Sequence, residues 1–376
     1  MAFFLRNMKN LLIGIIALGF LSGCNSGVNE EVSEKNLNVN ETSEDPVVEG
    51  SYRIFIHKHG VKTKKALAFQ YKFGEPVGDG ILVYETNYDS KGNLLDSLVY
   101  GSNKVSFHEK YTYNDKNELI IRVLIDSLGK EVQKSERTFN QDGLESGFAM
   151  YANDSLYYKQ NREYNGKEEL IRLTEFDASG NPKLVSEFTY NENGDLLSQT
   201  ELDNAGNILS KVGYSYDEKG NKVSISNYNS LGKLQGKTLL KDYEKGNAKL
   251  IEKYDANDSL YASYQYEYSE EGEETKNIIL NGIGQVIRQS NTTIDENGNK
   301  VLFEIYEGEV GFLGKDEVKY NESGQETELT VFDNKNQQVK RKLTVYNPKG
   351  LVIKEENFNK IDEPIYQFKY EYTYFK

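Results

Sequence analysis

The sequence is poor in the residues from which most metal sites and many active sites are built. Its 376 residues include one cysteine, three histidines and no tryptophan. A single cysteine excludes an intrachain disulfide and any metal site made of several cysteine ligands. The three histidines, His57, His59 and His108, leave little for histidine-based catalysis. His57 and His59 would form a metal pair without a third ligand, so we expect neither a metal site nor a cofactor.

Proline is also scarce, and the 45 basic residues are outnumbered by 59 acidic ones. The chain has 5 prolines against 32 glycines, it contains 28 tyrosines and 17 phenylalanines, and its formal net charge is −14. This composition favours strands and turns over helices. Nucleic acid is not an expected partner, because its binding depends on cationic side chains that neutralise phosphates, and no basic stripe is present.

The sequence has no apolar run long enough to span a bilayer as a helix. Its most hydrophobic stretch is the run from Leu11 to Phe20, which follows the basic residues Arg6 and Lys9. Ten apolar residues are too few for a permanent transmembrane helix, which needs about 20. A basic segment, a short apolar run and small residues after it are typical of a secretion signal, so residues 1–23 are predicted to be one.

The segment Leu21-Ser22-Gly23-Cys24 directly follows that run and resembles the lipobox of bacterial lipoproteins. The resemblance implies transfer of a diacylglyceryl group to Cys24, cleavage before it and usually N-acylation. Several acyl chains matter, because one chain alone gives only marginal membrane binding. Asn25 in place of aspartate is similar to lipoproteins that are sorted to the outer membrane, and Glu30, Glu31 and Glu34 resemble an export signal of surface lipoproteins.

Residues 24–50 are rich in Asn, Glu, Ser and Val and are predicted to form a flexible acidic tether. Residues 51–376 are predicted to form one repeat domain. From Tyr88 onward an aromatic or apolar residue is followed by Asp or Asn, two variable residues and Gly, as in Tyr216-Asp217-Glu218-Lys219-Gly220. These motifs alternate at steps of about 12 and 14 residues, which gives a period of 26. The identical blocks at 153–157 and 257–261 lie four periods apart.

Each motif has the chemistry of a hairpin turn. Asp or Asn starts a type I turn by accepting backbone hydrogen bonds, and Gly takes the left-handed conformation of the bulge that follows. Asn117, Asp258, Asn336 and Asp362 replace Gly at four turns, and these residue types tolerate positive φ. Residues 51–87 are predicted to begin the same sheet, with a degraded first turn at 56–60.

The segments between turns alternate in hydrophobicity, as in Ile208, Ser210, Val212, Tyr214 and Tyr216. The expected fold is all-β: a tandem β-hairpin array that forms a long antiparallel meander. Open sheets of more than about 10 strands tend to curl, so we expect a spiral or superhelical sheet.

The motif Tyr-Asp-x-x-Gly-Asn at 88–93 and 216–221 resembles the YD repeats of RHS proteins. The resemblance covers residues 88–376, although those repeats are usually nearer 21 residues, and neither the RHS core-associated segment nor a C-terminal toxin is recognisable. It implies an accessory piece of a YD-repeat toxin system as one possible role. The glycine-spaced segment 73–80 resembles MORN-type hairpin repeats.

Few residues suggest a ligand site. Repeated acidic turns such as 295–299 offer fewer converging carboxylates than a calcium loop needs. Adjacent carboxylates such as Glu355 and Glu356 point to opposite faces of a strand and cannot act together as an acid/base pair. Tyr157 and Tyr261 oppose the aromatic face of their strands, and they are the candidates for an exposed aromatic patch that binds glycan or peptide.

We therefore expect a non-enzymatic lipoprotein of the cell envelope. Cys24 would attach it to the membrane, and the repeat sheet would serve as a binding or structural scaffold for a protein or glycan partner. The outer membrane is the expected location, with the body on its periplasmic side or at the cell surface. A glycan-binding or carbohydrate-active surface lipoprotein is the alternative.

Overall fold

The computed structural model describes residues 50–101 and 104–376. They fall into two compact units, and four strands of the sheet contribute residues to both. The described part of the smaller unit consists of residues 50–63, 87–95 and 373–376. The larger unit contains Lys64–Thr86 and the long segment Asp96–Tyr372, and it carries almost all of the repeats.

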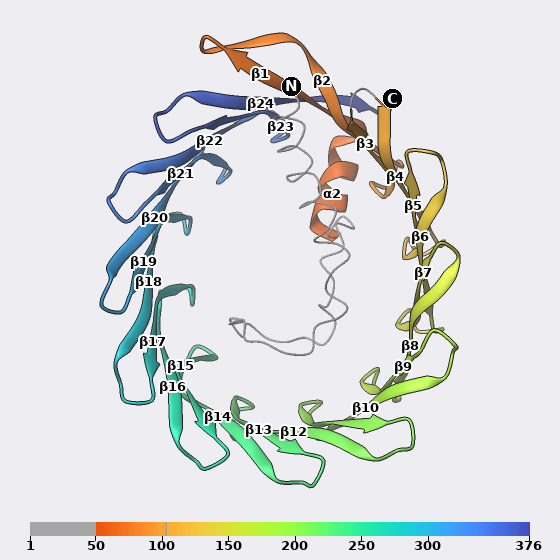
Figure 1. Cartoon of the computed structure of the whole chain (residues 1–376), viewed down its shortest axis with the longest axis vertical. Coiled ribbons are helices and arrows are strands. Elements are labelled where there is room, and N and C mark those ends of the chain that lie inside the picture. Colours follow the sequence, from red (N-terminus) through yellow and green to blue (C-terminus); the bar gives the residue numbers. More distant parts are fainter. Residues whose placement is uncertain (1–49, 102–103) are drawn as a thin grey trace. The chain divides into compact units, whose positions relative to one another are not determined.

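One helix and twenty-four strands make up the described fold (Figure 1). The helix is α2 (Gly50–His59), and the first twelve strands are β1 (Val61–Lys72), β2 (Glu75–Tyr88), β3 (Leu94–Gly101), β4 (Lys104–Tyr113), β5 (Leu119–Asp126), β6 (Glu131–Phe139), β7 (Glu145–Ala152), β8 (Ser155–Tyr164), β9 (Leu170–Phe176), β10 (Pro182–Tyr190), β11 (Leu196–Asp203) and β12 (Ile208–Tyr216). The remaining strands are β13 (Lys222–Asn229), β14 (Leu234–Glu244), β15 (Asn247–Asp255), β16 (Leu260–Tyr268), β17 (Glu274–Asn281), β18 (Val286–Ile294), β19 (Lys300–Glu307), β20 (Gly311–Tyr320), β21 (Glu326–Phe332), β22 (Gln338–Tyr346), β23 (Val352–Phe358) and β24 (Pro364–Tyr374).

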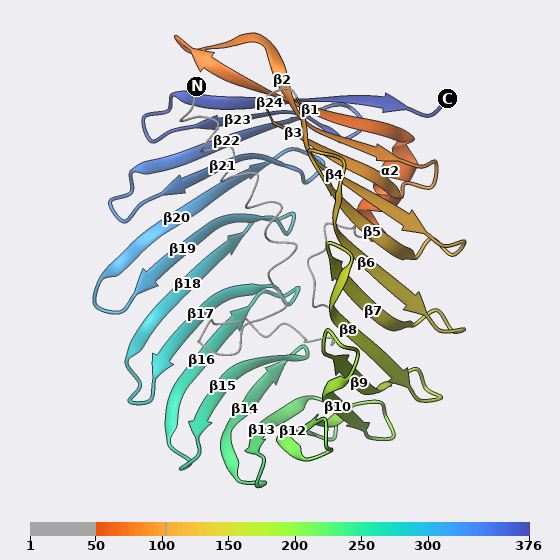
Figure 2. The same cartoon turned by 45° about the vertical axis from the view of Figure 1, so that its right-hand side comes forward.

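The strands form a single 24-stranded sheet in which each strand pairs with the next along the chain. The pairs from β3–β4 to β23–β24 are antiparallel, and Figure 2 shows the hairpins following one another in chain order. The all-β hairpin array predicted from the sequence is confirmed. The sheet also curls as predicted. Its strand pairing is closed, because β1 pairs with β24 as well as with β2.

Side chains reinforce this meeting of the first and last strands within the larger unit. The Tyr71 hydroxyl of β1 donates a hydrogen bond of 2.6 Å to the Glu356 carboxylate of β23. The ammonium group of Lys64 lies 4.7 Å from the centre of the Tyr370 ring, and that of Lys369 lies 4.6 Å from the centre of the Phe69 ring. β1 is therefore joined to the end of the chain by polar and cation–π contacts as well as by backbone pairing.

The turns have the geometry that their sequence predicts. In the turn after β12, the Asp217 carboxylate accepts hydrogen bonds from the backbone N–H groups of Lys219 (2.9 Å) and Asn221 (2.8 Å). Gly220 then takes a φ of 82°, in the left-handed region. The four predicted glycine substitutes, Asn117, Asp258, Asn336 and Asp362, have φ between 58° and 66°. The sequence prediction of a type I turn with a bulge is therefore confirmed.

A second regularity of the turns concerns their first and fifth residues. Where the first residue is Asp, an Asn at the fifth position donates its amide to the carboxylate, as Asn221 does to Asp217 (2.9 Å). Where the first is Asn, an acid at the fifth accepts from it, as Asp195 does from Asn191 (2.8 Å). The first arrangement recurs at 89/93, 177/181, 203/207 and 295/299, and the second at 114/118, 165/169 and 359/363. The Asn that ends the Tyr-Asp-x-x-Gly-Asn motif thus serves as the donor to the turn carboxylate.

Residues 50–59 correct one expectation. They form the helix α2 and not the beginning of the sheet. Ile56 is fully buried, whereas Ile54 is exposed on the helix. Gly60, with a φ of 62°, donates its N–H to the His57 carbonyl (3.0 Å) and ends the helix in the manner of a C-terminal glycine cap. The glycine that suggested a degraded turn is therefore a helix terminator.

Candidate interaction surfaces

Tyrosines at the ends of the even-numbered strands form a repeated set of hydrogen bonds. The Tyr216 hydroxyl of β12 donates to the backbone carbonyl of Leu196, the first residue of β11, at 2.9 Å. Each such bond joins the open end of one hairpin, opposite its turn. The same bond, at a separation of 19 to 21 residues, is made by Tyr164, Tyr190, Tyr243, Tyr268, Tyr320, Tyr346 and Tyr372. At the equivalent end of β18 stands Ile294, which has no hydroxyl.

Basic residues and aromatic rings form a second repeated set at the opposite ends of the strands. Lys237 of β14 lies directly opposite Tyr254 of β15, and its ammonium group is 5.1 Å from the ring centre. Four further cross-strand pairs repeat this contact, at Lys134/Tyr151, Lys159/Phe176, Lys315/Phe332 and Arg341/Phe358. Such pairs are individually worth about 0.5–1 kcal/mol at exposed sites. Both sets fasten neighbouring strands to each other.

The carboxylates inside the sheet are held by hydrogen-bonding partners. The Glu109 carboxylate accepts hydrogen bonds from the Tyr111 hydroxyl and from the Arg122 guanidinium, the latter at 2.9 Å. Burial, followed by the charge of Glu109, raises the pKa of Tyr111 far above its usual range. This arrangement keeps Tyr111 protonated and occupies the carboxylate, which makes the group a cross-strand brace.

Glu355 and Glu356, the adjacent acids on β23, have different partners. Glu355 accepts a hydrogen bond from Tyr370 of β24, and Glu356 accepts one from Tyr71 of β1. Burial acts to raise the pKa of Glu356, but hydrogen bonds from Lys354 and Tyr71 and the charges of Lys354 and Lys369 outweigh it, so the net shift is downward. Each acid therefore fastens β23 to a separate tyrosine.

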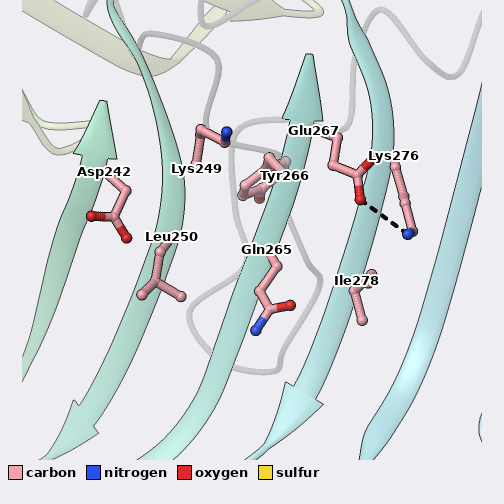
Figure 3. Close-up of a pocket in the computed structure, with 8 residues that line it drawn as sticks. All are labelled: Asp242, Lys249, Leu250, Gln265, Tyr266, Glu267, Lys276 and Ile278. Atoms are coloured by element: carbon pink, nitrogen blue, oxygen red, sulfur yellow. Dashed lines mark hydrogen bonds and ion pairs between the residues drawn. The ribbon is translucent and has the colours of Figure 1, made fainter. Parts of the chain in front are cut away.

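One small cavity of about 250 Å³ lies over strands β14 to β17 (Figure 3). Its walls include Tyr266 of β16, together with Glu267 and Lys276, whose side chains form an ion pair at 3.0 Å. Burial, followed by the charge of Glu274, raises the pKa of Tyr266 to about 12. The remaining lining residues are Asp242, Lys249, Leu250, Gln265 and Ile278. This volume is below the range of about 300–1,000 Å³ in which most small-molecule sites fall.

The residues singled out from the sequence lie apart. Tyr157 of β8 is 44 % exposed and Tyr261 of β16 is 56 % exposed. Seven strands separate β8 from β16 in the pairing order, so the structure does not bring the two rings together. Cys24, the predicted lipidation site, lies outside the described residues.

The histidines have local partners. His57 lies on α2, where its Nδ1 is 2.7 Å from the Ser90 carbonyl, and the His59 ring packs edge-on against Phe55. His108 of β4 approaches the Asp96 carboxylate at 3.8 Å. Within residues 50–101 and 104–376 no three histidine, cysteine, aspartate or glutamate side chains gather as a metal site would require. In that same part of the chain no helix is long and apolar enough to cross a membrane.

Comparison with known proteins yields one family model and several solved structures of low similarity. A family model described as "Uncharacterised protein" matches residues 77–215, and no curated protein matches the chain. The TcdB2-TccC3-TEV crystal structure is similar at 12 % identity and a TM-score of 0.32, over 76 % of this chain and 21 % of that one.

Two further structures have comparable scores. The Photorhabdus luminescens Tc holotoxin pore has 11 % identity and a TM-score of 0.30, over 76 % of this chain and 20 % of that one. A porin-like protein from Bacteroides uniformis has 10 % identity and a TM-score of 0.27, over 83 % and 98 %. This chain thus spans about a fifth of the length of the Tc chains that it matches.

Proposed function

We propose that this chain is a lipid-anchored, non-enzymatic scaffold of the bacterial cell envelope. Cys24 carries the anchor, the following acidic segment is the tether, and the repeat sheet is the surface that a partner uses. The motif Leu21-Ser22-Gly23-Cys24 after a basic and apolar leader supports the anchor. The outer membrane is the proposed location.

The observation that carries the scaffold function is the repetition of side-chain contacts along the sheet. The tyrosine–carbonyl bonds return with the repeat, as at Tyr190, Tyr216 and Tyr268, and each one joins two neighbouring strands. Catalytic sites usually depend on side chains placed once, on distinctive loops above a rigid frame. A surface built from equivalent units is suited to holding an extended partner, as in other repeat proteins.

The anchor is tested by metabolic labelling with an acyl-chain probe in cells that produce the full chain. We expect the label on the wild-type protein and its loss in Cys24→Ser. Absence of label, or label that survives the substitution, contradicts the anchor. The Cys24→Ser chain should also leave the membrane fraction after cell disruption.

The scaffold is tested by placing a photoreactive residue on each face of one strand of the anchored protein. Lys211 and Tyr214 of β12 point to opposite faces, because side chains alternate along a strand. We expect a discrete crosslinked partner from one of the two positions and none from Lys219, which lies in the following turn. Equal and diffuse crosslinking from all three positions contradicts a specific surface.

The alternative of a glycan-binding or carbohydrate-active protein has its own readout. The full chain can be used to probe a glycan array. Specific binding to a glycan would show that the ligand of the repeat sheet is a sugar and not a protein. Hydrolysis of any bound glycan would contradict the non-enzymatic assignment.

A further inference from the structure

The two edges of the larger unit, where its strands turn, differ sharply in chemistry. The turns that join odd-numbered strands to the next even-numbered strand lie along one edge, and the remaining turns lie along the other (Figures 1 and 2). On the first edge, six turns carry a large apolar side chain that is 66 to 95 % exposed. These are Phe73, Leu128, Leu231, Ile283, Val310 and Ile361, and we call them the hydrophobic edge.

The strands that leave these turns add further apolar exposure. Even-numbered strands begin at this edge, and large apolar side chains near their beginnings are exposed. They are Tyr157, Ile208, Leu209, Tyr261, Val286, Ile287, Val339 and Ile365. Tyr157 and Tyr261, which the sequence marked as exposed aromatics, thus share this edge although they do not share a patch.

The opposite edge is charged at its turns, although Ile171 and Leu197, near the starts of β9 and β11, are also exposed. Its ten turns in the larger unit, from β4–β5 to β22–β23, have no large apolar residue at their central positions. Those positions hold mainly lysine and glutamate, for example Lys116, Lys167, Glu218, Lys219, Glu296 and Glu322. Most turns on both edges use the same hairpin geometry, for example those at 217–221 and 229–233, so the turn fold itself does not impose the difference.

Apolar turn residues at this exposure contribute little to packing within the chain. Turn centres usually hold polar residues or glycine, and isolated exposed apolar residues are common on proteins. Six turns with an exposed apolar residue on one edge, against none at the turn centres of the other, instead make the sheet amphipathic along its strand axis. Amphipathic helices bury their apolar face in the boundary between headgroups and acyl chains, where tyrosine is also enriched, and an edge of exposed apolar side chains offers the same kind of contact.

We propose that the hydrophobic edge sits in the interfacial layer of a lipid bilayer, with the charged edge turned away from it. This inference rests on the proposed anchor, which brings the chain to a membrane. The stretch from Cys24 to Gly50 has a contour length of roughly 90 Å at most, so the anchor alone would not determine which edge meets the lipid.

The spacing of the apolar turns favours lipid over a protein partner. Successive turns on one edge are two strands apart, or about 10 Å, and several turns between the apolar ones are polar, such as those at 177–181 and 333–337. A stable protein interface needs a contiguous, well-packed patch, whereas fluid lipid fills the space around separate side chains. The many acids of the charged edge would also be repelled by anionic lipid headgroups.

The test uses the lipidated full-length protein in vesicles of phosphatidylcholine and phosphatidylethanolamine. Cys24 is the only cysteine, so lipidation leaves no free thiol and an introduced cysteine can be labelled with an environment-sensitive fluorophore. Leu231→Cys and Lys219→Cys are matched positions, because they occupy the turns at the two ends of β13. Melting curves of both variants should match that of the parent, since both side chains lie in exposed turns.

We expect the probe at position 231 to shift to shorter wavelength and to be quenched by doxyl-labelled lipid, while the probe at 219 is quenched by aqueous iodide. Replacing Ile283 and Ile361 by serine should weaken the lipid quenching at 231. Equal iodide access at both positions in protein that floats with the vesicles overturns the interfacial location alone. A chain that does not float, and whose Cys24 takes the fluorophore, contradicts the anchor and the interfacial location together.

Discussion

The Tyr216 hydroxyl donates a hydrogen bond of 2.9 Å to the carbonyl of Leu196, twenty residues earlier in the chain. Leu196 begins β11 and Tyr216 ends β12, so the bond closes the end of this hairpin that has no turn. The bond belongs to a series that recurs along the sheet, as at Tyr190–Leu170 and Tyr346–Glu326. Tyrosine at this position therefore contributes a hydrogen bond between strands in addition to the packing of its ring.

Tyr216→Phe removes this bond while keeping the ring in place. We expect the free energy of unfolding to fall by about 1 kcal/mol, because the Leu196 carbonyl loses a donor in a partly buried site. Denaturant unfolding measures the loss, and hydrogen exchange should locate it in β11 and β12. Tyr228→Phe, at the opposite end of the next strand, is the control. An equal loss in the two variants would show that ring substitution, not the hydrogen bond, sets the effect.

The same tyrosines predict an alkaline limit to stability. Burial, the largest cause, raises the pKa of Tyr190, Tyr216 and Tyr268 above the ordinary value of about 10. A raised pKa means that the folded chain holds these protons more tightly than the unfolded chain does. The contribution is therefore complete below about pH 10 and is lost as the pH rises through the folded pKa values.

Melting temperature should thus decline above about pH 10, together with the appearance of tyrosinate absorbance. Tyr266, with a pKa of about 12, should ionise only after Tyr190, Tyr216 and Tyr268, or upon unfolding. Tyr216→Phe should reduce the steepness of the decline. A melting temperature that stays constant while tyrosinate forms would contradict the coupling.

The hairpin array was predictable because the residues of each turn are sufficient to identify it. Asp217 and Gly220 have the chemistry of a type I turn with a bulge, and the 26-residue spacing repeats it. The tyrosine bonds were not predictable, since they depend on which strand end faces which carbonyl. The alternation of side chains along a strand was enough to predict that Tyr157 and Tyr261 are exposed. It did not predict how far apart they lie, because that distance depends on the strand order.

Helix α2 and the hydrophobic edge required the structure for different reasons. The segment 56–60 fits both a degraded hairpin turn and the end of a short helix with a glycine cap, and the helical backbone of residues 50–59 separates the two. The apolar residues Leu231 and Ile283 were visible in the turns of the sequence. That they share one edge follows only from the strand order, which places alternate turns on opposite edges.

The complementary first and fifth turn residues predict a rescue by exchange. Asn221→Asp would place a second carboxylate beside Asp217 in place of the amide that donates to it. We expect this variant to melt at a lower temperature than the parent. The double variant Asp217→Asn with Asn221→Asp reproduces the arrangement of Asn191 and Asp195 and should recover most of the loss. A double variant less stable than both single variants would contradict the donor–acceptor rule.

The exchange also has a pH signature. Hydrogen bonds from the Asn221 side chain, together with that residue's backbone N–H, lower the pKa of Asp217 below its usual value. A lowered pKa gives a contribution that is present above the unfolded pKa and is lost as pH falls through the folded one. Asp217→Asn should therefore reduce the acid sensitivity of the melting temperature. Unchanged acid sensitivity would mean that this turn carboxylate is not stabilised by folding.

Gly92 permits the contact between α2 and the turn after β2. It has a φ of 84°, and a Cβ atom added to it would lie 2.3 Å from the Arg53 carbonyl oxygen. Gly220 has nearly the same φ, 82°, but a Cβ there would meet no atom within 4 Å. Alanine at either position incurs the cost of a positive φ, and only Gly92→Ala forces the helix and the turn apart.

We expect Gly92→Ala to be less stable than Gly220→Ala by about 1–3 kcal/mol, the usual cost of overpacking. If the helix detaches instead, the difference will appear as faster hydrogen exchange in residues 50–59 together with a loss of protection at Ile56. The matched control separates this contact from backbone strain, because both glycines share the left-handed conformation. Equal stability and equal exchange in the two variants would show that α2 does not pack on this turn in solution.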